Sequence, residues 1–170
     1  MYRIWGTCQG KTTVIEILAS MGYKVIPEAA RMVIEEEQIK NSEILPWKNL
    51  SKFQEIVAMR QLQAEEKIQS NVGQSVFLDR GIIDGYGYCL RGGVTPPASI
   101  TDNAKNRYEK IFVLDPLELY EKDSVRFEDK EEAQKSHLNI IEAYKNFGYE
   151  PIFVPVMPPE DRVEFILNRL

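Results

Sequence analysis

Short apolar runs that alternate with helical patterns constrain this 170-residue chain more than any other feature of its sequence. Three of the runs, at residues 76–78, 111–114 and 152–154, contain no polar residue. A strand that is apolar on both faces is typical of a parallel sheet with helices packed on both sides. The pattern therefore predicts an α/β fold of three layers.

Two further short runs and several periodic segments complete the expected order of elements. We expect strands at residues 2–5, 23–26, 76–78, 111–114 and 152–154, and helices near 11–21, 28–38, 51–68, 81–90, 101–107, 130–147 and after 159. Ser51-Lys52-Phe53-Gln54 matches a capping box, which predicts the start of the third helix. Ligands of parallel sheets bind at the carboxyl ends of strands, so the residues that follow each strand are the candidates for a site.

The first strand is followed by Gly6 and then by Gly10-Lys11-Thr12-Thr13 at the start of a helix. Unpaired backbone amides and the helix dipole bind phosphate at such a position. A lysine adds positive charge beside the β- and γ-phosphates, and a threonine hydroxyl ligates Mg²⁺. These five residues are therefore candidate ligands of ATP or another NTP, and Thr12 is a candidate Mg²⁺ ligand. A chance Gly-Lys-Thr is the alternative, but the strand-to-helix context favours a phosphate loop.

The phosphate loop is shorter than a complete P-loop motif, which has a glycine five residues before Gly10. That position holds Trp5, and the nearest glycine is Gly6. Two interpretations stay open: a compact variant of the loop, or a printed sequence from which loop residues are missing. We expect Lys11 to lie exposed at this turn, so Lys11→Ala should abolish nucleotide binding while changing stability by only about 0.5 kcal/mol.

The second strand is followed by Glu28-Ala29-Ala30-Arg31 on the first turn of a helix. A spacing of three places Glu28 and Arg31 on one helical face. Together they could hold and deprotonate an acceptor hydroxyl, or bind an anionic substrate. The alternative is an acidic residue at a helix start beside a solvated arginine.

The third strand is followed by Asp79-Arg80-Gly81. An aspartate directly after an apolar strand is the Walker-B arrangement, which holds Mg²⁺, usually through water, or supports the threonine that holds it. Arg80 would then reach the acceptor, and Asp84 lies about one helical turn further on. The alternative is that Asp79 caps the following helix, and both roles are compatible.

Two later segments are candidates for the remaining contacts with a nucleotide. A charged stretch within residues 116–130 is expected to form a small lid, in which Arg126 stabilises charge in the transition state; a solvated turn is the alternative. Pro155 and Val156 follow the last strand. They suit the apolar face of a nucleobase, although a rigid connector would look the same.

Composition excludes several classes of protein. The net charge of −5 and the isoelectric point near 5.1 argue against nucleic acid as the main partner. No apolar run approaches the roughly 20 residues that span a bilayer, so no membrane segment is expected. One histidine and two cysteines disfavour a zinc site and fit a reducing, cytoplasmic setting. We expect residues 1–170 to form a single P-loop domain, with oligomerisation left open.

Residues 10–13, residues 22–31 and Phe77-Leu78-Asp79-Arg80-Gly81 resemble the P-loop ATPases of the nicotinamide-riboside-kinase-like group. Residues 144–155 and 160–162 are similar as well, so the resemblance covers nearly the whole chain. It implies a nucleoside/nucleotide-kinase-like fold with a five-stranded parallel sheet of order 2-3-1-4-5, binding of ATP and Mg²⁺, and phosphoryl transfer. It also makes Arg126 similar to the lid arginine of adenylate-kinase-like enzymes. The acceptor does not carry over, because members of the group act on different compounds.

The leading hypothesis is a small-molecule kinase that transfers the γ-phosphoryl group of ATP to a nucleoside- or nucleotide-like acceptor. Its catalytic candidates are Lys11, Glu28, Asp79, Arg80 and Arg126. Its acceptor-binding candidates are Glu28, Arg31, Arg80 and Asp84. The alternatives are an NTPase or nucleotide-dependent switch without a small-molecule acceptor, and a scaffold with a decayed phosphate loop.

Overall fold

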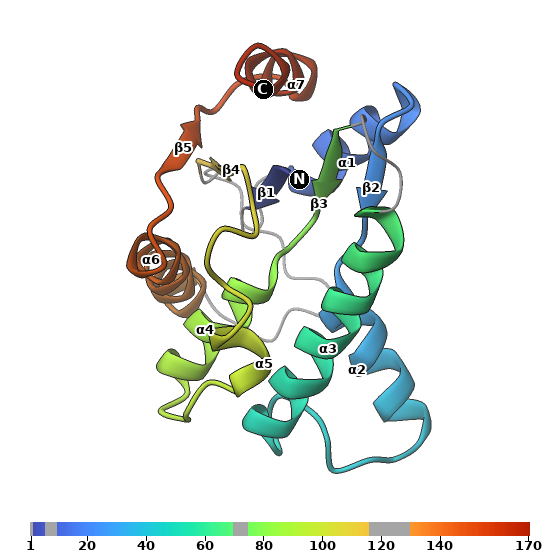
Figure 1. The fold of residues 1–170 in the computed structure, drawn as a ribbon, viewed down its shortest axis with the longest axis vertical. Coiled ribbons are helices and arrows are strands. Elements are labelled where there is room, and N and C mark those ends of the chain that lie inside the picture. The colour runs from blue at the N-terminus through green and yellow to red at the C-terminus, as the bar shows by residue number, and fades with distance from the viewer. Residues whose placement is uncertain (1, 6–9, 70–74, 116–129) are drawn as a thin grey trace.

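The computed structural model describes residues 2–5, 10–69, 75–115 and 130–170 (Figure 1). The elements in chain order are β1 (Tyr2–Trp5), α1 (Lys11–Ser20), β2 (Lys24–Ile26), α2 (Ala29–Ile39), α3 (Leu50–Gln69), β3 (Val76–Leu78), α4 (Ile82–Arg91), α5 (Ala98–Thr101), β4 (Lys110–Leu114), α6 (Lys130–Asn146), β5 (Pro151–Val154) and α7 (Pro159–Leu167). Gly6, Arg126 and nearly all of the predicted lid lie outside the described residues.

All five strands are parallel and lie in the order β2-β3-β1-β4-β5. The predicted parallel α/β sheet is therefore confirmed, and the strand order equals the one that the family resemblance implied. Pairing extends one residue past β3 and β4, because Asp79 N donates to Ile26 O at 2.9 Å and Asp115 N donates to Val154 O at 2.9 Å. These bonds fix both aspartates at the carboxyl edge of the sheet.

Two apolar cores cover the opposite faces of the sheet, because successive side chains of a strand point to opposite sides. The first core joins Phe77 of β3, Phe112 of β4 and Val154 of β5 to α1 and α7. The second joins neighbouring residues of β3 and β4, such as Leu78 and Val113, to α3, α4 and α6. In Figure 1 the helix α7 accordingly lies on the other side of the sheet from α4 and α6.

The capping box predicted at Ser51 is wrong, because α3 begins at Leu50. Asn49 occupies the cap instead, and its Oδ1 accepts a hydrogen bond from Lys52 N at 3.1 Å. Asparagine is among the best residues at this position because its side chain satisfies an amide that has no helical partner. Gln54 is therefore not a capping residue, and its side chain is available for another role.

The helix predicted at residues 101–107 is also displaced, because the observed helix α5 ends at Thr101. Asn106 adopts a positive φ of 55°, which ends any helical continuation. The Tyr149 hydroxyl binds this turn. It donates a hydrogen bond to Ala104 O at 2.7 Å and accepts one from Arg107 N at 2.8 Å. A distant aromatic side chain thus replaces the hydrogen bonds that a local helix would have made.

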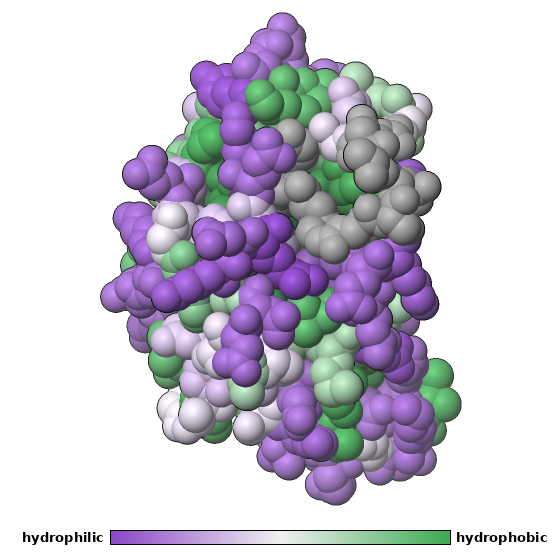
Figure 2. All heavy atoms as spheres, in the orientation of Figure 1, coloured by the Kyte–Doolittle hydropathy of each residue, from purple (hydrophilic) through white to green (hydrophobic). Residues whose placement is uncertain are grey.

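Among the residues that the structure describes, no helix is both long enough and apolar enough to cross a membrane. Hydrophilic side chains predominate on the face drawn in Figure 2, and the apolar ones are scattered among them.

Candidate active site

The candidate site lies where α1 begins and where β2 and β3 end. Gly10 precedes α1 with φ of 72°, a left-handed conformation that glycine adopts without strain. This turn makes Lys11 the first helical residue. Lys11 is only 9% exposed, so the prediction that it lies exposed is wrong. Its side chain is buried because it lies against two carboxylates that follow neighbouring strands.

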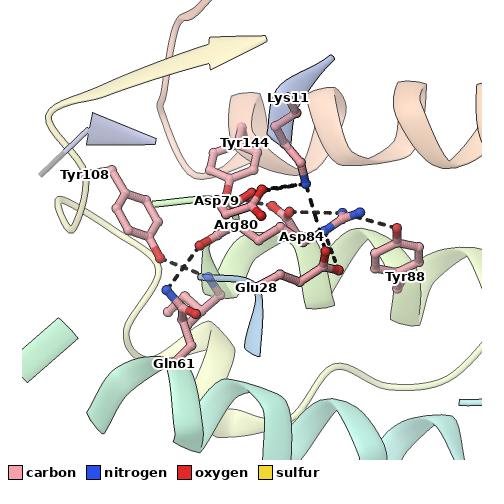
Figure 3. Close-up of polar contacts among 10 residues, drawn as sticks. Lys11, Glu28, Gln61, Asp79, Arg80, Asp84, Tyr88, Tyr108 and Tyr144 are labelled. Atoms are coloured by element: carbon pink, nitrogen blue, oxygen red, sulfur yellow. Dashed lines mark hydrogen bonds and ion pairs between the residues drawn. The ribbon is translucent and has the colours of Figure 1, made fainter. Parts of the chain in front are cut away.

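Lys11 and Asp79 form the central ion pair of the site (Figure 3). Lys11 Nζ lies 2.6 Å from Asp79 Oδ1 and donates to the backbone oxygen of Asp79 at 3.4 Å. The same ammonium lies 4.0 Å from Glu28 Oε2. The structure therefore brings together residues that follow β1, β2 and β3, as expected for the carboxyl edge of a parallel sheet.

Arg80 forms the second ion pair, with Glu28. Arg80 Nε lies 2.7 Å from Glu28 Oε1. Its NH1 donates to the Tyr88 hydroxyl at 3.3 Å and lies 3.5 Å from Asp84 Oδ2. The guanidinium also lies 5.8 Å from the centre of the Tyr88 ring, within the range of a cation–π contact. Arg80 is thus held on several sides, with its charge directed towards Glu28.

Asp84 is 3% exposed and connects Arg80 to the long helix α6. Its Oδ1 accepts a hydrogen bond from the Tyr144 hydroxyl at 2.8 Å, and its Oδ2 faces Arg80. The carboxylate predicted to bind substrate is therefore engaged by groups of the protein itself. Its direct effect is to orient the Arg80 guanidinium.

The electrostatics of the cluster follow from burial and close pairing. Burial lowers the pKa of Lys11 and Arg80 adds to this shift, while Glu28 and Asp79 act in the opposite direction. Burial alone would raise the pKa of Glu28, but Arg80, Lys11 and Arg31 hold it below the ordinary value of 4.5. Burial opposes the charge on Arg80 as well, yet Glu28 raises the pKa of that guanidinium. Glu28 is therefore an anion at neutral pH.

A pocket opens beside Arg80. Its walls come from the start of α2, from α3, from the Arg80–Gly81 turn, from α4 and from Ile100 of α5. Most of the lining is apolar, with polar side chains supplied by Gln54, Gln61, Arg80, Asp84 and Tyr88. An apolar lining with a few polar groups beside a charged cluster makes this pocket a candidate for binding part of a small molecule.

Gln54 is the polar side chain of this pocket whose hydrogen-bonding capacity is least used. It is 5% exposed, and its amide makes no hydrogen bond to another described side chain or carbonyl. Gly85 lies opposite, and a Cβ added there would lie 2.7 Å from Gln54 Oε1 and 2.9 Å from Ile100 Cδ1. The glycine therefore leaves the space into which the Gln54 amide projects.

The other predicted site residues lie around this cluster. Thr12 and Thr13 are exposed on the first turn of α1. Arg31 is exposed on α2, and its charge contributes to the lowered pKa of Glu28. Pro155 and Val156 are exposed after β5.

Arg162 of α7 fixes the position of the segment after β5. It is 2% exposed, and its Nε donates to Pro155 O at 3.1 Å. Its NH2 donates to Asp115 O at 3.4 Å, so the guanidinium joins the carboxyl ends of β4 and β5.

Sequence reasoning missed the polar face of α3. Gln54, Gln61 and Glu65 are 5%, 3% and 0% exposed, respectively. Their spacing of seven and then four residues places them on one side of the helix. Three polar residues along the buried side of an otherwise amphipathic helix are a signal that sequence alone contains, and they indicate a polar cavity or network beneath the helix.

A lysine at the start of the helix after β1, paired with an aspartate after β3 in a parallel sheet of this order, defines a P-loop protein with a nucleoside-kinase-like fold. Residues 4–162 match the family model described as an AAA domain, and the chain belongs to that family. A comparison with curated protein sequences gave no match.

Solved structures of deoxyadenosine kinase from M. mycoides share this fold. The one with products dCMP and a flexible dCDP bound has a TM-score of 0.62 at 18% identity, over 99% of this chain and 97% of that chain. The one with bound dCTP has a TM-score of 0.57 at 16% identity, over 99% and 98% of the two chains. The one with bound dATP has a TM-score of 0.53 at 17% identity, over 99% and 97%.

Proposed function

We propose that this protein binds ATP with Mg²⁺ and transfers the γ-phosphoryl group to a hydroxyl or phosphate oxygen of a nucleoside-like small molecule. The observation that carries the proposal is the position of the Glu28–Arg80 pair. It lies between the Lys11–Asp79 pair and the pocket that contains Gln54. A cation for phosphate and a carboxylate for an acceptor are thus held side by side.

The nucleotide side of the site consists of the start of α1. Free backbone amides at the helix start attract the phosphates, and Lys11 adds a positive charge as it exchanges Asp79 for phosphate oxygens. Pro155, whose carbonyl oxygen binds Arg162, and the adjacent Val156 would contact the base. Phosphoryl transfer needs this kind of positioning and charge stabilisation more than it needs covalent catalysis.

The residues fit a magnesium ion. Asp79 Oδ1 is buried and accepts no hydrogen bond from a described residue, although it is paired with Lys11. No group of three or more His, Cys, Asp or Glu side chains within the described ranges is placed to hold a metal. That fits Mg²⁺, which is usually bound by one or two protein oxygens and the substrate phosphates. Asp79 and Thr12 would hold the ion, which neutralises charge on the phosphates when bound.

The acceptor side of the site consists of Glu28 and Arg80. The anionic Glu28 accepts the hydrogen bond of an acceptor hydroxyl and then its proton. The acceptor oxygen forms a bond to the γ-phosphorus while the bond between that phosphorus and the β–γ bridging oxygen breaks, leaving ADP. Arg80 stabilises negative charge on the transferred group, or binds an acceptor phosphate.

The pocket favours a nucleoside-like acceptor. The Gln54 amide offers one donor and one acceptor side by side, which matches the polar edge of a nucleobase. Apolar residues such as Val57 and Ile100 line the pocket where a flat ring would pack. The names of the solved kinases with the same fold, which concern deoxyadenosine and deoxynucleotides, support the same class of acceptor.

The test is a screen of nucleosides, deoxynucleosides and nucleoside monophosphates with ATP and Mg²⁺, read by thermal shift and by ADP release. We expect one class to raise the melting temperature and to stimulate ADP release. Lys11→Met should abolish the response to ATP, and Gln54→Leu should weaken only the response to the acceptor. ADP release that no acceptor stimulates would contradict the proposal and favour an NTPase or switch. Failure to bind any nucleotide would favour a scaffold.

A further inference from the structure

A second polar network, which shares Gln61 with the lining of the pocket, holds the turn that carries Asp79 and Arg80. Gln61 Nε2 donates to Arg80 O at 3.1 Å. The Tyr108 hydroxyl accepts a hydrogen bond from Ile82 N at 2.9 Å. These two backbone groups flank Gly81, between the end of β3 and the start of α4. Figure 3 shows Gln61 and Tyr108 near Arg80.

Both side chains that hold the turn also bind the same carboxylate oxygen. Glu65 Oε1 accepts from Gln61 Nε2 at 3.0 Å and from the Tyr108 hydroxyl at 3.0 Å. Arg107 pairs with the other oxygen of Glu65 through its Nε. Glu65 is 0% exposed, so its charge is balanced by Arg107 within the interior. We call Gln61, Glu65 and Tyr108 the turn clamp.

Gly81 makes this close arrangement compatible with the backbone. A Cβ added to Gly81 would lie 2.7 Å from the Tyr108 hydroxyl and 2.8 Å from the Tyr144 hydroxyl. The Tyr108 hydroxyl accepts a hydrogen bond from Ile82 N in the turn. The Tyr144 hydroxyl donates one to Asp84, the residue that faces Arg80. The turn is therefore enclosed by two tyrosines that approach it closely because no side chain stands between them.

We propose that Glu65 is a positioning residue, which fixes the directions of Asp79 and Arg80 by orienting Gln61 and Tyr108. The inference deepens the proposed function and rests on it for its catalytic consequence. A tyrosine hydroxyl has one hydrogen to donate. When that hydrogen points to Glu65, the lone pairs of the oxygen face the Ile82 amide. In the same way, Glu65 and Arg80 O together fix the orientation of the Gln61 amide group.

The clamp and the site meet at Arg80. Its backbone oxygen is held by Gln61, while its guanidinium is held by Glu28 at 2.7 Å. A turn that is free to rotate would carry the guanidinium and the adjacent Asp79 carboxylate away from Glu28 and Lys11. Small displacements of catalytic groups reduce rates steeply, so the clamp should act on turnover more than on ground-state nucleotide binding.

Tyr108→Phe is the cleanest probe, because it removes one hydroxyl and keeps the buried ring. Glu65→Gln is the second variant, and it keeps the shape of the side chain while removing the charge that faces Arg107. Tyr86→Phe is the matched control: it removes a hydroxyl from α4 itself, from a ring that packs edge-on against Phe147 with a centroid distance of 5.0 Å. Amide hydrogen exchange at Ile82 and the kinetic constants for ATP are measured for each.

In Tyr108→Phe we expect exchange at Ile82 to become about tenfold faster, as for the loss of one hydrogen bond. We expect kcat to fall about tenfold or more while the KM for ATP changes less than about twofold. Glu65→Gln should give the same split between kcat and KM. Tyr86→Phe should change neither quantity. Unchanged exchange at Ile82, or faster exchange with unchanged kcat, would overturn the positioning role.

Exchange at Ile82 separates this inference from the proposed function. If the wild-type protein transfers no phosphoryl group, the proposed function fails, and the catalytic part of the inference fails with it. The clamp is then judged by exchange at Ile82 and by the NMR signals of the Arg80 guanidinium, which forms an ion pair with Glu28. A Tyr108→Phe variant that leaves both signals unchanged would refute the clamp itself.

Discussion

Asp79 and Lys11 neutralise each other across 2.6 Å. Under the proposed function, each would have to lose this partner before it binds a nucleotide or a metal, so the ion pair would compete with both ligands. Its burial makes the competition stronger than it would be at the surface, where water screens such a contact. At the scale of the residue, the proposed ligand binding therefore replaces the Lys11–Asp79 ion pair with contacts between each of these residues and the ligand.

Asp79→Asn tests this exchange. The variant keeps the shape of the side chain and removes its charge, so the Lys11 ammonium no longer has this competitor. We expect ATP without metal to bind at least as tightly as it binds the wild-type protein. We also expect the gain in affinity on adding Mg²⁺ to be lost. Calorimetric titration in EDTA and in Mg²⁺ measures both, with Asp102→Asn, an exposed carboxylate on another turn, as the control.

If Mg²⁺ raises the affinity of Asp79→Asn for ATP as much as that of the wild-type protein, then Asp79 only caps the following helix and pairs with Lys11. Weaker binding of metal-free ATP than in the wild-type protein would show that Asp79 holds Lys11 in place instead of competing for it.

Glu28 gives a prediction about pH. Its pKa in the folded protein lies below the ordinary value of 4.5, so its charge stabilises the fold above that value. The stabilisation is lost as the pH falls through the lower folded-state pKa. The free energy of unfolding should therefore decrease less between about pH 6 and 3 in Glu28→Gln than in the wild-type protein. Denaturant unfolding at several pH values measures this, with the exposed Glu43→Gln as the control.

At the scale of the element, α4 shapes the pocket through a glycine, which has no side chain. Gly85 faces Gln54 and Ile100 on the pocket side, and Gly87 faces Ile140 of α6 on the other side. Both glycines cost helix stability, roughly 1 kcal/mol each relative to alanine. Their presence is explained by the close approach of neighbouring groups, which leaves no room for a Cβ.

Gly85→Ala should therefore act on the pocket selectively. The added Cβ would lie 2.7 Å from Gln54 Oε1, so the amide must shift and the pocket narrows. We expect the KM for the acceptor to rise about tenfold or more, with ATP affinity unchanged. Gly87→Ala is the matched control, since its Cβ meets the backbone of Ile140 at 3.1 Å and should reduce stability by about 1–3 kcal/mol without a selective effect on the acceptor. An equal change in both KM values for Gly85→Ala would contradict this role.

Most elements could be predicted from the sequence, because apolar runs and helical periodicity are local signals. The start of α3 could not, since Ser51 and Asn49 both suit a helix cap and the choice depends on where the helix packs. The short α5 could not either, because its end depends on a hydroxyl of the distant Tyr149.

The strand-end residues of the site were predictable for the same reason: topology brings the carboxyl ends of parallel strands together. The burial of Lys11 and the projection of Gln54 into the pocket depend on side-chain packing between separate elements. No local pattern encodes such packing. Sequence reasoning therefore identified the charged centre of the site and missed the pocket beside it.

At the scale of the whole molecule, the sheet couples two cores. Phe112 lies in the core with α1 and α7, and its neighbour Val113 lies in the core with α4 and α6. Adjacent residues of one buried strand thus belong to opposite sides of the protein. Loss of either core removes support for the strand that both cores share, so the described parts of the chain should unfold together.

Leu18→Ala in α1 and Ile140→Ala in α6 test this coupling. Both residues are almost fully buried, and each change should cost about 2–5 kcal/mol. We expect either variant to speed the exchange of the most protected amides in α1 and α6 alike. The exposed Lys135→Ala in α6 is the control and should affect neither. Acceleration confined to the mutated side would show that the two cores unfold separately.

The charges around the candidate site also affect the rate at which a charged ligand associates with it. Lys11, Arg31 and Arg80 are offset by Glu28, Asp79 and Asp84, within a chain of net charge −5. Long-range attraction, which speeds the encounter of oppositely charged molecules, therefore does not assist a free polyphosphate. Under the proposed function, a nucleotide already complexed with a divalent cation would meet less repulsion and bind faster. Salt at 0.1 M screens charges that lie more than about 10 Å apart. We therefore expect moderate ionic strength to raise the rate of nucleotide binding. At a basic phosphate-binding cleft, the same salt would lower that rate.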